Sequence, residues 1–218
     1  TLTYGEYLGD IQVVRLLRVF RTAAIYEGKR ADTPVLLKVA HAGHEDTLHD
    51  EAEALAQLTG HNIPSLPVLL PPYEGADIRR SPYGKAVFRG ETRYYLLFAY
   101  MRGVFLRDLL YENPEPWYRH AAWITIAVAR AVSYLHAHRR VLHLSLNPDI
   151  ILVDFDEKPR IPNTLLLDMG LMLGGESLPR PPEDVYARIL QHVPVSYAAP
   201  ELVKRAEIGN HTDVYGVG

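Results

Sequence analysis

The stretch His143-Leu144-Ser145-Leu146-Asn147-Pro148-Asp149-Ile150-Ile151-Leu152 decides how this sequence is interpreted. Its polar first half and apolar close are typical of a loop that leads into a short buried strand. Ser145 carries a neutral hydroxyl, which cannot act as a base near pH 7. Ile150 offers no oxygen ligand to a hard cation such as Mg²⁺. Neither general-base catalysis nor metal binding can therefore come from these two positions.

The segments before this stretch contain first a strand pattern and then a helix pattern. Residues 10–40 predict antiparallel strands, and the last of them is an apolar run in which Lys38 is the one charged side chain. Apolar residues then recur at helical spacing over residues 46–59, and Glu51 lies on that helix. The chain thus offers a lysine on a buried strand and a glutamate on the helix that follows.

The segments after residue 93 change from strand to helix. Residues 94–101 form an apolar strand pattern, and residues 117–136 form a helix pattern that is apolar on most faces. Three short motifs follow in the second half of the chain, namely Asp168-Met169-Gly170, Ala199-Pro200-Glu201 and the run from Asp213 to Gly218. Strands come first and helices second, which predicts two lobes.

In this order and spacing, these segments resemble the motifs of protein kinases, in the form of a bacterial-type Ser/Thr kinase-like pseudokinase. The opening stretch resembles the catalytic loop, written H-R-D-L-K-P-x-N-I-L, and the strand around Lys38 resembles the V-A-I-K motif. Residues 168–170 resemble D-F-G, and residues 199–201 match A-P-E. Each motif is weak alone, but together they extend from about residue 10 to the end of the sequence.

The resemblance implies an α+β fold, the bilobal protein kinase-like fold. Residues 1–102 would form an N-lobe with a five-stranded antiparallel sheet and one regulatory helix. Residues 103–218 would form part of a mostly helical C-lobe, which ends at the start of its central helix and so would be truncated. We therefore expect either that the sequence is a piece of a longer protein or that a partner completes this lobe.

The departures from the kinase pattern concern phosphate transfer. The resemblance places Ser145 where the catalytic Asp would stand and Ile150 where the Asn for a second magnesium would stand, so no catalytic residue is expected. Leu144 replaces the arginine that would bind a phosphate on the activation segment, and Pro194 replaces the usual threonine there. Switching by phosphorylation of that segment is therefore not expected.

The segment that should form the glycine-rich phosphate loop, Leu17–Ala23, has no glycine. Glycine lets backbone N–H groups approach a phosphate without a Cβ in the way. Arg18, Phe20 and Ala23 carry side chains at those positions. Three interpretations stay open: an ordinary β-hairpin without a ligand, a displaced loop, or a loop under which Phe20 folds to fill the pocket. Arg18 and Arg21 are expected to face solvent.

The remnants of a nucleotide site are Lys38, Glu51, Ala99, Met101 and Asp168. The resemblance makes Lys38 and Glu51 an ion pair, which can be structural without ATP because a buried lysine needs a partner. Ala99 and Met101 would belong to the hinge that meets adenine. Asp168 could hold one Mg²⁺ against nucleotide phosphates, or it could instead accept backbone hydrogen bonds at the turn that follows it.

The composition excludes several classes of protein. A net charge of −3 over 218 residues gives no electrostatic footprint for nucleic acid. The lack of cysteine excludes disulfides and thiolate metal sites, and the histidines have no spacing that favours zinc. No apolar run approaches the ~18 residues of a membrane span, and the N-terminus has no signal-peptide pattern. We therefore expect a cytoplasmic protein without a membrane span in this segment.

The leading interpretation is a catalytically inactive, kinase-like domain that acts as a protein-binding or regulatory scaffold without a cofactor. Its partners would be another protein or other domains of a longer chain, contacted through segments such as the insertion at 71–93, Tyr94-Tyr95 and the proline-rich residues 179–182. One alternative is a nucleotide sensor that binds ATP with Mg²⁺ and does not turn it over. The other is an atypical nucleotide-dependent transferase.

Overall fold

The computed structural model describes residues 1–61, 63–112, 118–155, 161–169, 172–174, 177–178 and 181–218. The chain folds into two compact units, and each is described by itself. The first comprises Thr1–Asn62 and Pro67–Met101, and the second comprises Ile63–Leu66 and Arg102–Gly218. The division after Met101 lies one residue before the lobe boundary expected from the sequence. The short segment Ile63–Leu66 crosses into the second unit, which the sequence did not predict.

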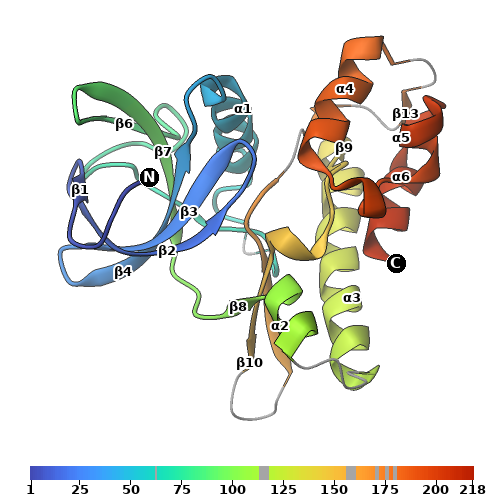
Figure 1. Cartoon of the computed structure of the whole chain (residues 1–218), viewed down its shortest axis with the longest axis horizontal. Helices are drawn as coiled ribbons and strands as arrows, with labels where there is room; N and C mark the ends of the chain where they lie inside the picture. The colour runs from blue at the N-terminus through green and yellow to red at the C-terminus, as the bar shows by residue number, and fades with distance from the viewer. Residues whose placement is uncertain (62, 113–117, 156–160, 170–171, 175–176, 179–180) are drawn as a thin grey trace. The chain divides into compact units, whose positions relative to one another are not determined.

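The first unit is an antiparallel sheet with one helix (Figure 1). Within the described residues the sheet has seven strands in the order β1-β2-β3-β4-β7-β5, with β6 paired to β7. The prediction of five strands is wrong, because the two-residue strands β1 and β5 extend the sheet. The elements are β1 Tyr7–Leu8, β2 Ile11–Val19, β3 Ala23–Arg30, β4 Thr33–Ala40, α1 Glu45–Ala56, β5 Leu69–Leu70, β6 Gly84–Phe88 and β7 Glu91–Ala99.

The two faces of this sheet bury different side chains, because successive residues of a strand point to opposite faces. One face forms an apolar core that includes Tyr26, Leu37 and Leu97. On β4, Lys38 follows Leu37 and so belongs to the other face, where it pairs across the strands with Ile25 and Leu96. The alternation of β4 therefore places one lysine among apolar neighbours.

Helix α1 carries the acidic partner of that lysine. Its buried residues recur at helical spacing, and Glu51 is among them at 2% exposure. Asp50 and Glu53, on either side of it, are exposed. The periodicity of the helix therefore singles out Glu51 as the acidic residue that faces the unit's interior.

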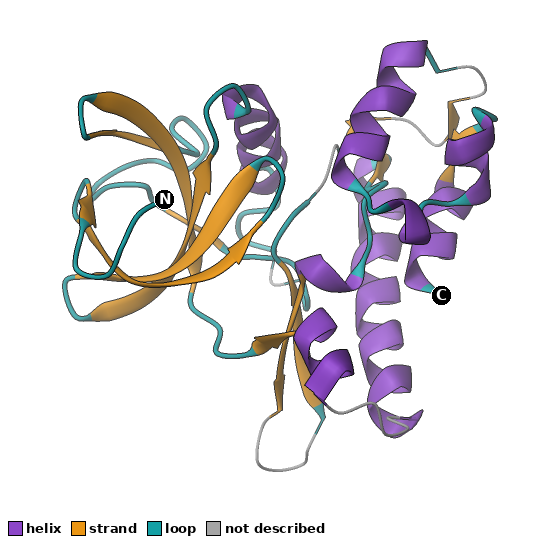
Figure 2. Ribbon diagram, viewed as in Figure 1, coloured by secondary structure: helices purple, strands orange, loops and turns teal. Residues whose placement is uncertain are grey.

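The second unit is mostly helical, with a small three-stranded sheet in the order β11-β10-β8 (Figure 2). Helix α3 is the longest of the described helices, with 17 residues. The elements are β8 Val104–Phe105, α2 Leu106–Glu112, α3 Tyr118–Tyr134, the π-helical turn η1 Leu135–Arg139, β9 Val141–Leu142, the 3₁₀ turn η2 Pro148–Ile150, β10 Ile151–Phe155, β11 Pro162–Leu166, β12 Leu173–Gly174, β13 Ser177–Leu178, α4 Glu183–His192, the 3₁₀ turn η3 Val195–Tyr197, α5 Pro200–Lys204, β14 Ile208–Gly209 and α6 Asn210–Val217.

An apolar cluster in the second unit joins the loop after β9 to helices α4 and α5. Leu144 is 3% exposed and packs in this cluster with Tyr186, Ile189 and Leu202. Its backbone has a φ of 62°, in the left-handed region that a leucine seldom adopts. The side chain at position 144 therefore serves the apolar core, where a charged arginine would need a partner of opposite charge.

Among the described residues, no helix combines the length and the apolar character needed to cross a membrane.

Candidate functional site

In the first unit, Lys38 and Glu51 form a buried ion pair. Lys38 Nζ lies 2.5 Å from Glu51 Oε2, and each side chain is 2% exposed. Burial of either charge alone would cost several kcal/mol, so each residue provides the counter-charge that makes the other tolerable. The predicted ion pair is present. Whether it also contacts a nucleotide stays a prediction.

The turn between β2 and β3 is tight and lies against the end of β4. Phe20 N–H donates to the carbonyl of Ala23 at 2.8 Å, which closes the turn around two residues. His41, directly after β4, holds the same turn by two hydrogen bonds. Its Nε2 lies 3.0 Å from the Phe20 carbonyl, and its backbone N–H donates to the Thr22 carbonyl at 2.8 Å. The segment is therefore a hairpin fixed to the neighbouring strand.

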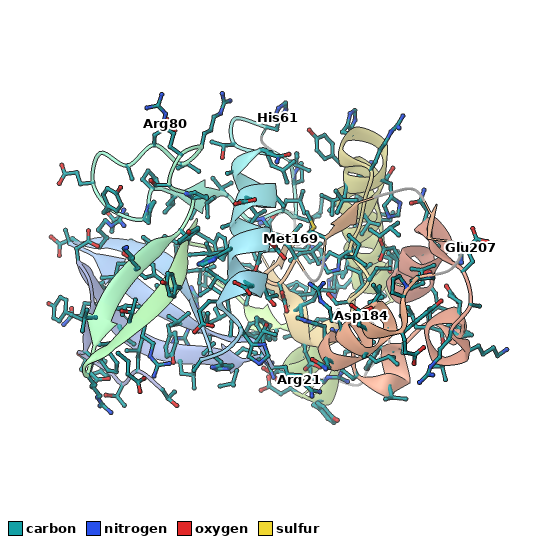
Figure 3. The ribbon with its side chains drawn as sticks, turned by 90° about the horizontal axis from the view of Figure 1, so that it is seen from above. Arg21, His61, Arg80, Met169, Asp184 and Glu207 are labelled. Carbon is teal, nitrogen blue, oxygen red and sulfur yellow. The ribbon has the colours of Figure 1, made fainter. Side chains whose placement is uncertain are left out.

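The side chain of Phe20 is buried under this turn. It is 9% exposed, and Lys38 Nζ lies 5.9 Å from the centre of its ring. The segment is thus a hairpin with a buried Phe20, whereas the absence of a ligand and the filling of a nucleotide pocket by Phe20 stay predictions. Arg21 is exposed as expected, and it is labelled in Figure 3. Arg18 is half-buried, so the expectation that it faces solvent is only partly right.

The hinge segment lies at the end of β7. Phe98 is fully buried, and its strand position pairs with Leu36 of β4. Ala99 donates its backbone N–H to the carbonyl of Val68 at 2.9 Å, so this group is already engaged inside the unit. Ala99 and Met101 are half-buried. Their contact with adenine stays a prediction.

In the second unit, Ser145 and His143 lie side by side in the loop after β9. His143 Nε2 donates to the carbonyl of Asp168 at 3.0 Å, so Nδ1 is the acceptor. The Ser145 hydroxyl lies 3.2 Å from that Nδ1. A Ser–His pair can supply a nucleophile and its base. Here both residues are 1% exposed or less, so their hydrogen bond serves the loop's structure.

Two further positions of the loop also serve its structure, namely Asn147, which stands where the catalytic-loop motif has lysine, and Ile150. Asn147 donates to the Ser145 carbonyl at 2.8 Å, and its Oδ1 accepts the Asp149 N–H at 2.9 Å, which caps the 3₁₀ turn η2. Ile150 is 3% exposed and packs in the core. The amide of Asn147 is therefore occupied within the loop, and Ile150 brings no metal ligand.

Asp168 is the remaining candidate for a metal ligand. It is 6% exposed, and Met169 beside it is fully buried. Gly170 lies outside the described residues, so the predicted turn cap there is not described. The described part of the chain contains no cluster of three or more His, Cys, Asp or Glu side chains that could hold a metal ion. Mg²⁺ prefers six oxygen ligands, so Asp168 could bind it only with oxygens from a substrate and water.

The sequence analysis missed the role of Asp213, on α6. This residue is 1% exposed. Its carboxylate accepts the backbone N–H groups of His143 at 2.8 Å and of Leu144 at 2.7 Å, and its Oδ2 also lies 2.8 Å from His136 Nε2. A carboxylate so placed holds the loop to the helix. The signal available in the sequence was the run from Asp213 to Gly218, but its spacing did not show which groups the carboxylate would bind.

A second missed feature is a polar network centred on Arg107. Its guanidinium contacts both carboxylate oxygens of Asp149, at 3.1 and 2.9 Å, and donates to the Tyr197 hydroxyl at 2.7 Å. The same group lies 4.8 Å from the centre of the Tyr197 ring. The pairing with Asp149 raises the pKa of Arg107 above its ordinary value. The network ties α2 to η2 and to η3, which precedes α5.

The surfaces expected to meet a partner differ in exposure. Tyr95 is buried and donates to the Pro72 carbonyl at 3.1 Å, so the expectation that it is a surface tyrosine is wrong. Tyr94 is half-buried against His49. In the insertion, Tyr73 is 51% exposed, and Arg80 extends away from the strands (Figure 3). Of the proline-rich residues, 179 and 180 lie outside the described part.

Sequence comparison identifies the family to which these features belong. Residues 82–218 match the family described as protein kinase domain. The chain belongs to the protein kinase family. The chain is 28% identical over 115 residues to the G-type lectin S-receptor-like serine/threonine-protein kinase RLK1 of Arabidopsis thaliana, which is 52% of this chain and 13% of that protein. It is 29% identical over 99 residues to the leaf rust 10 disease-resistance locus receptor-like protein kinase-like 2.2 of the same plant, 44% of this chain and 14% of that protein.

Solved structures share the kinase fold. Crystal structures of two variants of the PknI kinase domain from Mycobacterium tuberculosis align over the whole of this chain, with TM-scores of 0.59 and 0.63 and identities of 19% and 21%. This chain covers 74% and 73% of those chains. At this identity the likeness concerns the fold, and the predicted bilobal kinase-like class is confirmed.

Proposed function

We propose that this domain transfers no phosphate and acts by binding another protein or another part of a longer chain. The observation that carries the proposal is the state of Ser145. Its hydroxyl is buried and engaged with His143, and because it is neutral near pH 7 it cannot accept a proton from a substrate. The position that supplies the base in an active protein kinase is thus built into the interior of the loop.

The neighbouring positions support the same proposal. Ile150 cannot replace the oxygen ligand of a second Mg²⁺. The side-chain amide of Asn147 is hydrogen-bonded to the backbone of Ser145 and Asp149. Positioning and metal binding contribute most of the rate in this family, and general-base catalysis adds about 10²–10⁴. Without the base and the second metal ligand, this loop has no side chain that could carry out the reaction.

A role in binding is supported by exposed apolar and aromatic residues. In the first unit, Tyr73 in the insertion and Val87 on β6 are 51% and 72% exposed. In the second unit, α6 exposes Val214 and Tyr215, at 65% and 50%. Aromatic residues are enriched at the centres of protein interfaces, so we expect Tyr73 and Tyr215 to contribute to binding.

The test of inactivity is a phosphate-transfer assay with radiolabelled ATP, Mg²⁺ or Mn²⁺, and a mixture of Ser, Thr and Tyr peptides. We expect incorporation by the native protein to equal that of the Asp168→Asn variant, which sets the background. The Ser145→Asp variant places the carboxylate of active protein kinases at this position, and it is assayed beside the other two to show whether a base alone restores transfer. Incorporation by the native protein that disappears in Asp168→Asn would disprove the proposal.

A nucleotide sensor is the second candidate, and the Lys38–Glu51 ion pair favours it. A sensor would be stabilised by ligand, by about 2.7 kcal/mol at a concentration 100 times the Kd. Thermal unfolding with ATP or ADP, with and without Mg²⁺, distinguishes the two. A shift of Tm that is lost in Lys38→Ala and Asp168→Asn would establish a sensor, and no shift at millimolar nucleotide would exclude it.

A further inference from the structure

The β2–β3 turn in the first unit differs from a glycine loop in both backbone and side chains. Its backbone groups are engaged, because the N–H of Phe20 donates to Ala23 and the carbonyls of Phe20 and Thr22 accept hydrogen bonds from His41. A loop that binds phosphate needs its N–H groups directed at the ligand. This turn instead directs hydrogen bonds into its own hairpin and the neighbouring strand.

The ring of Phe20 lies next to the only charged group that β4 contributes. Lys38 Nζ is 5.9 Å from the ring centre, within the range of a cation–π contact. The ring is also 9% exposed, whereas Val19, one position earlier, is 55% exposed. The turn thus points one apolar side chain inward toward Lys38 and leaves its neighbour in solvent.

We propose that Phe20 is a built-in occupant of the space beside Lys38, and that its ring keeps the phosphate chain of a nucleotide away from this lysine. The inference rests on the proposed function, because it explains how a kinase-like domain keeps the Lys38–Glu51 pair without using it for ATP. The pair then forms the floor on which the ring packs.

His41 holds the turn that carries Phe20 in place. His41 lies three residues after Lys38 in the same chain segment. It forms hydrogen bonds with the carbonyls of the residues on both sides of Arg21. To leave the site, Phe20 must give up its burial and strain these hydrogen bonds. Exposure of a phenylalanine side chain alone weakens the affinity of a competing ligand by roughly ten- to a hundredfold.

The test compares Phe20→Gly with Val19→Gly. Both place one glycine in the same hairpin, but only the first removes the buried ring. The probes are inorganic tripolyphosphate, which presents the phosphate chain without adenine, and Mg·ATP, and the readout is the Kd from calorimetry. We expect Phe20→Gly to bind both probes at least about tenfold more tightly than the native protein. Val19→Gly should match the native protein.

Two further variants keep the test decisive. Adding Lys38→Met to Phe20→Gly should abolish the gain, because the site then lacks its cation. His41→Ala leaves the ring in place and loosens the turn, so it should give a smaller gain, and it remains informative if Phe20→Gly does not fold. Equal affinities for native protein and His41→Ala, or a folded Phe20→Gly without tighter binding, would overturn the inference.

This outcome is separate from that of the phosphate-transfer assay. Phe20→Gly retains Ser145 and Ile150, so we expect it to bind Mg·ATP without turning it over. Turnover by Phe20→Gly would count against the proposed inactivity of the catalytic loop and leave the role of Phe20 intact. Tight binding of tripolyphosphate by the native protein would count against the role of Phe20 alone.

Discussion

The two units depart from a phosphate-transferring site in different ways. The first unit keeps its charged pair, Lys38 and Glu51, and places a phenylalanine ring beside it. The second unit keeps the hydrogen bonds that hold its loop, through Asp213 and His143, and lacks the reactive side chains at positions 145 and 150. Residues whose removal would leave a buried group unpaired are present in both units.

Substitution of Asp213, which holds the loop of the second unit, should have the largest effect on stability. Asp213→Ala would leave two buried N–H groups and His136 without their acceptor, and each unsatisfied group costs about 1–3 kcal/mol. We expect a loss of about 4–6 kcal/mol in the free energy of unfolding, measured by urea denaturation. Asp213→Asn keeps one acceptor oxygen and should lose less. Equal losses in the two variants would mean that the carboxylate does not anchor the loop.

Substitution of Lys38 tests the ion pair of the first unit. Lys38→Met leaves Glu51 charged and buried, which should cost about 3–5 kcal/mol. The double variant Lys38→Met with Glu51→Leu replaces both charges by apolar groups and should recover most of that loss. Both are measured by urea denaturation. If the double variant is as unstable as the single one, the pair contributes more than mutual charge compensation.

The Arg107 network is a smaller test, because its partners are partly exposed. Arg107 and Asp149 are 22% and 29% exposed, so solvent weakens their attraction. Arg107→Ala should lower the free energy of unfolding by about 1–2 kcal/mol and speed hydrogen exchange in η3. Arg107→Lys keeps the charge but loses the contact with both carboxylate oxygens. Its free energy of unfolding should therefore lie between those of the native protein and of Arg107→Ala. Unchanged exchange in η3 after Arg107→Ala would show that the network does not hold that turn.

Features that leave a local pattern in the sequence could be predicted, and features built from residues far apart in the chain could not. The apolar run of β4 predicts a buried Lys38 and the helical period of α1 predicts the helix that carries Glu51, while their pairing was predicted from the resemblance to protein kinases. Arg107 meets Asp149 and Tyr197 across 42 and 90 residues, and Asp213 acts through backbone N–H groups that look alike in every sequence. Tertiary contacts of this kind leave no periodic pattern. For the same reason, the direction of Phe20 stayed one of three alternatives.

The smallest expected effect is a pH dependence that belongs to the first unit. Burial raises the pKa of Tyr26 and of Tyr95 above the ordinary value of 10.0. Both hydroxyls therefore stay protonated in the folded protein at a pH where they would ionise in the unfolded chain. Their contribution to stability is fully present below pH 10, and it is lost as the pH rises through the folded-state pKa.

The variants Tyr26→Phe and Tyr95→Phe should make the alkaline decline of stability shallower, since each removes one of the groups that ionise on unfolding. At neutral pH each should cost about 1 kcal/mol, because Tyr26 accepts the Leu2 N–H and Tyr95 donates to Pro72. Tyr4→Phe is the matched control, because that side chain is 82% exposed. Urea midpoints measured between pH 8 and pH 10.5 give the slope of stability against pH. Hydrogen exchange, measured separately for each unit, should show that the first unit loses protection before the second as the pH rises. A slope unchanged in both buried variants would assign the decline to groups elsewhere.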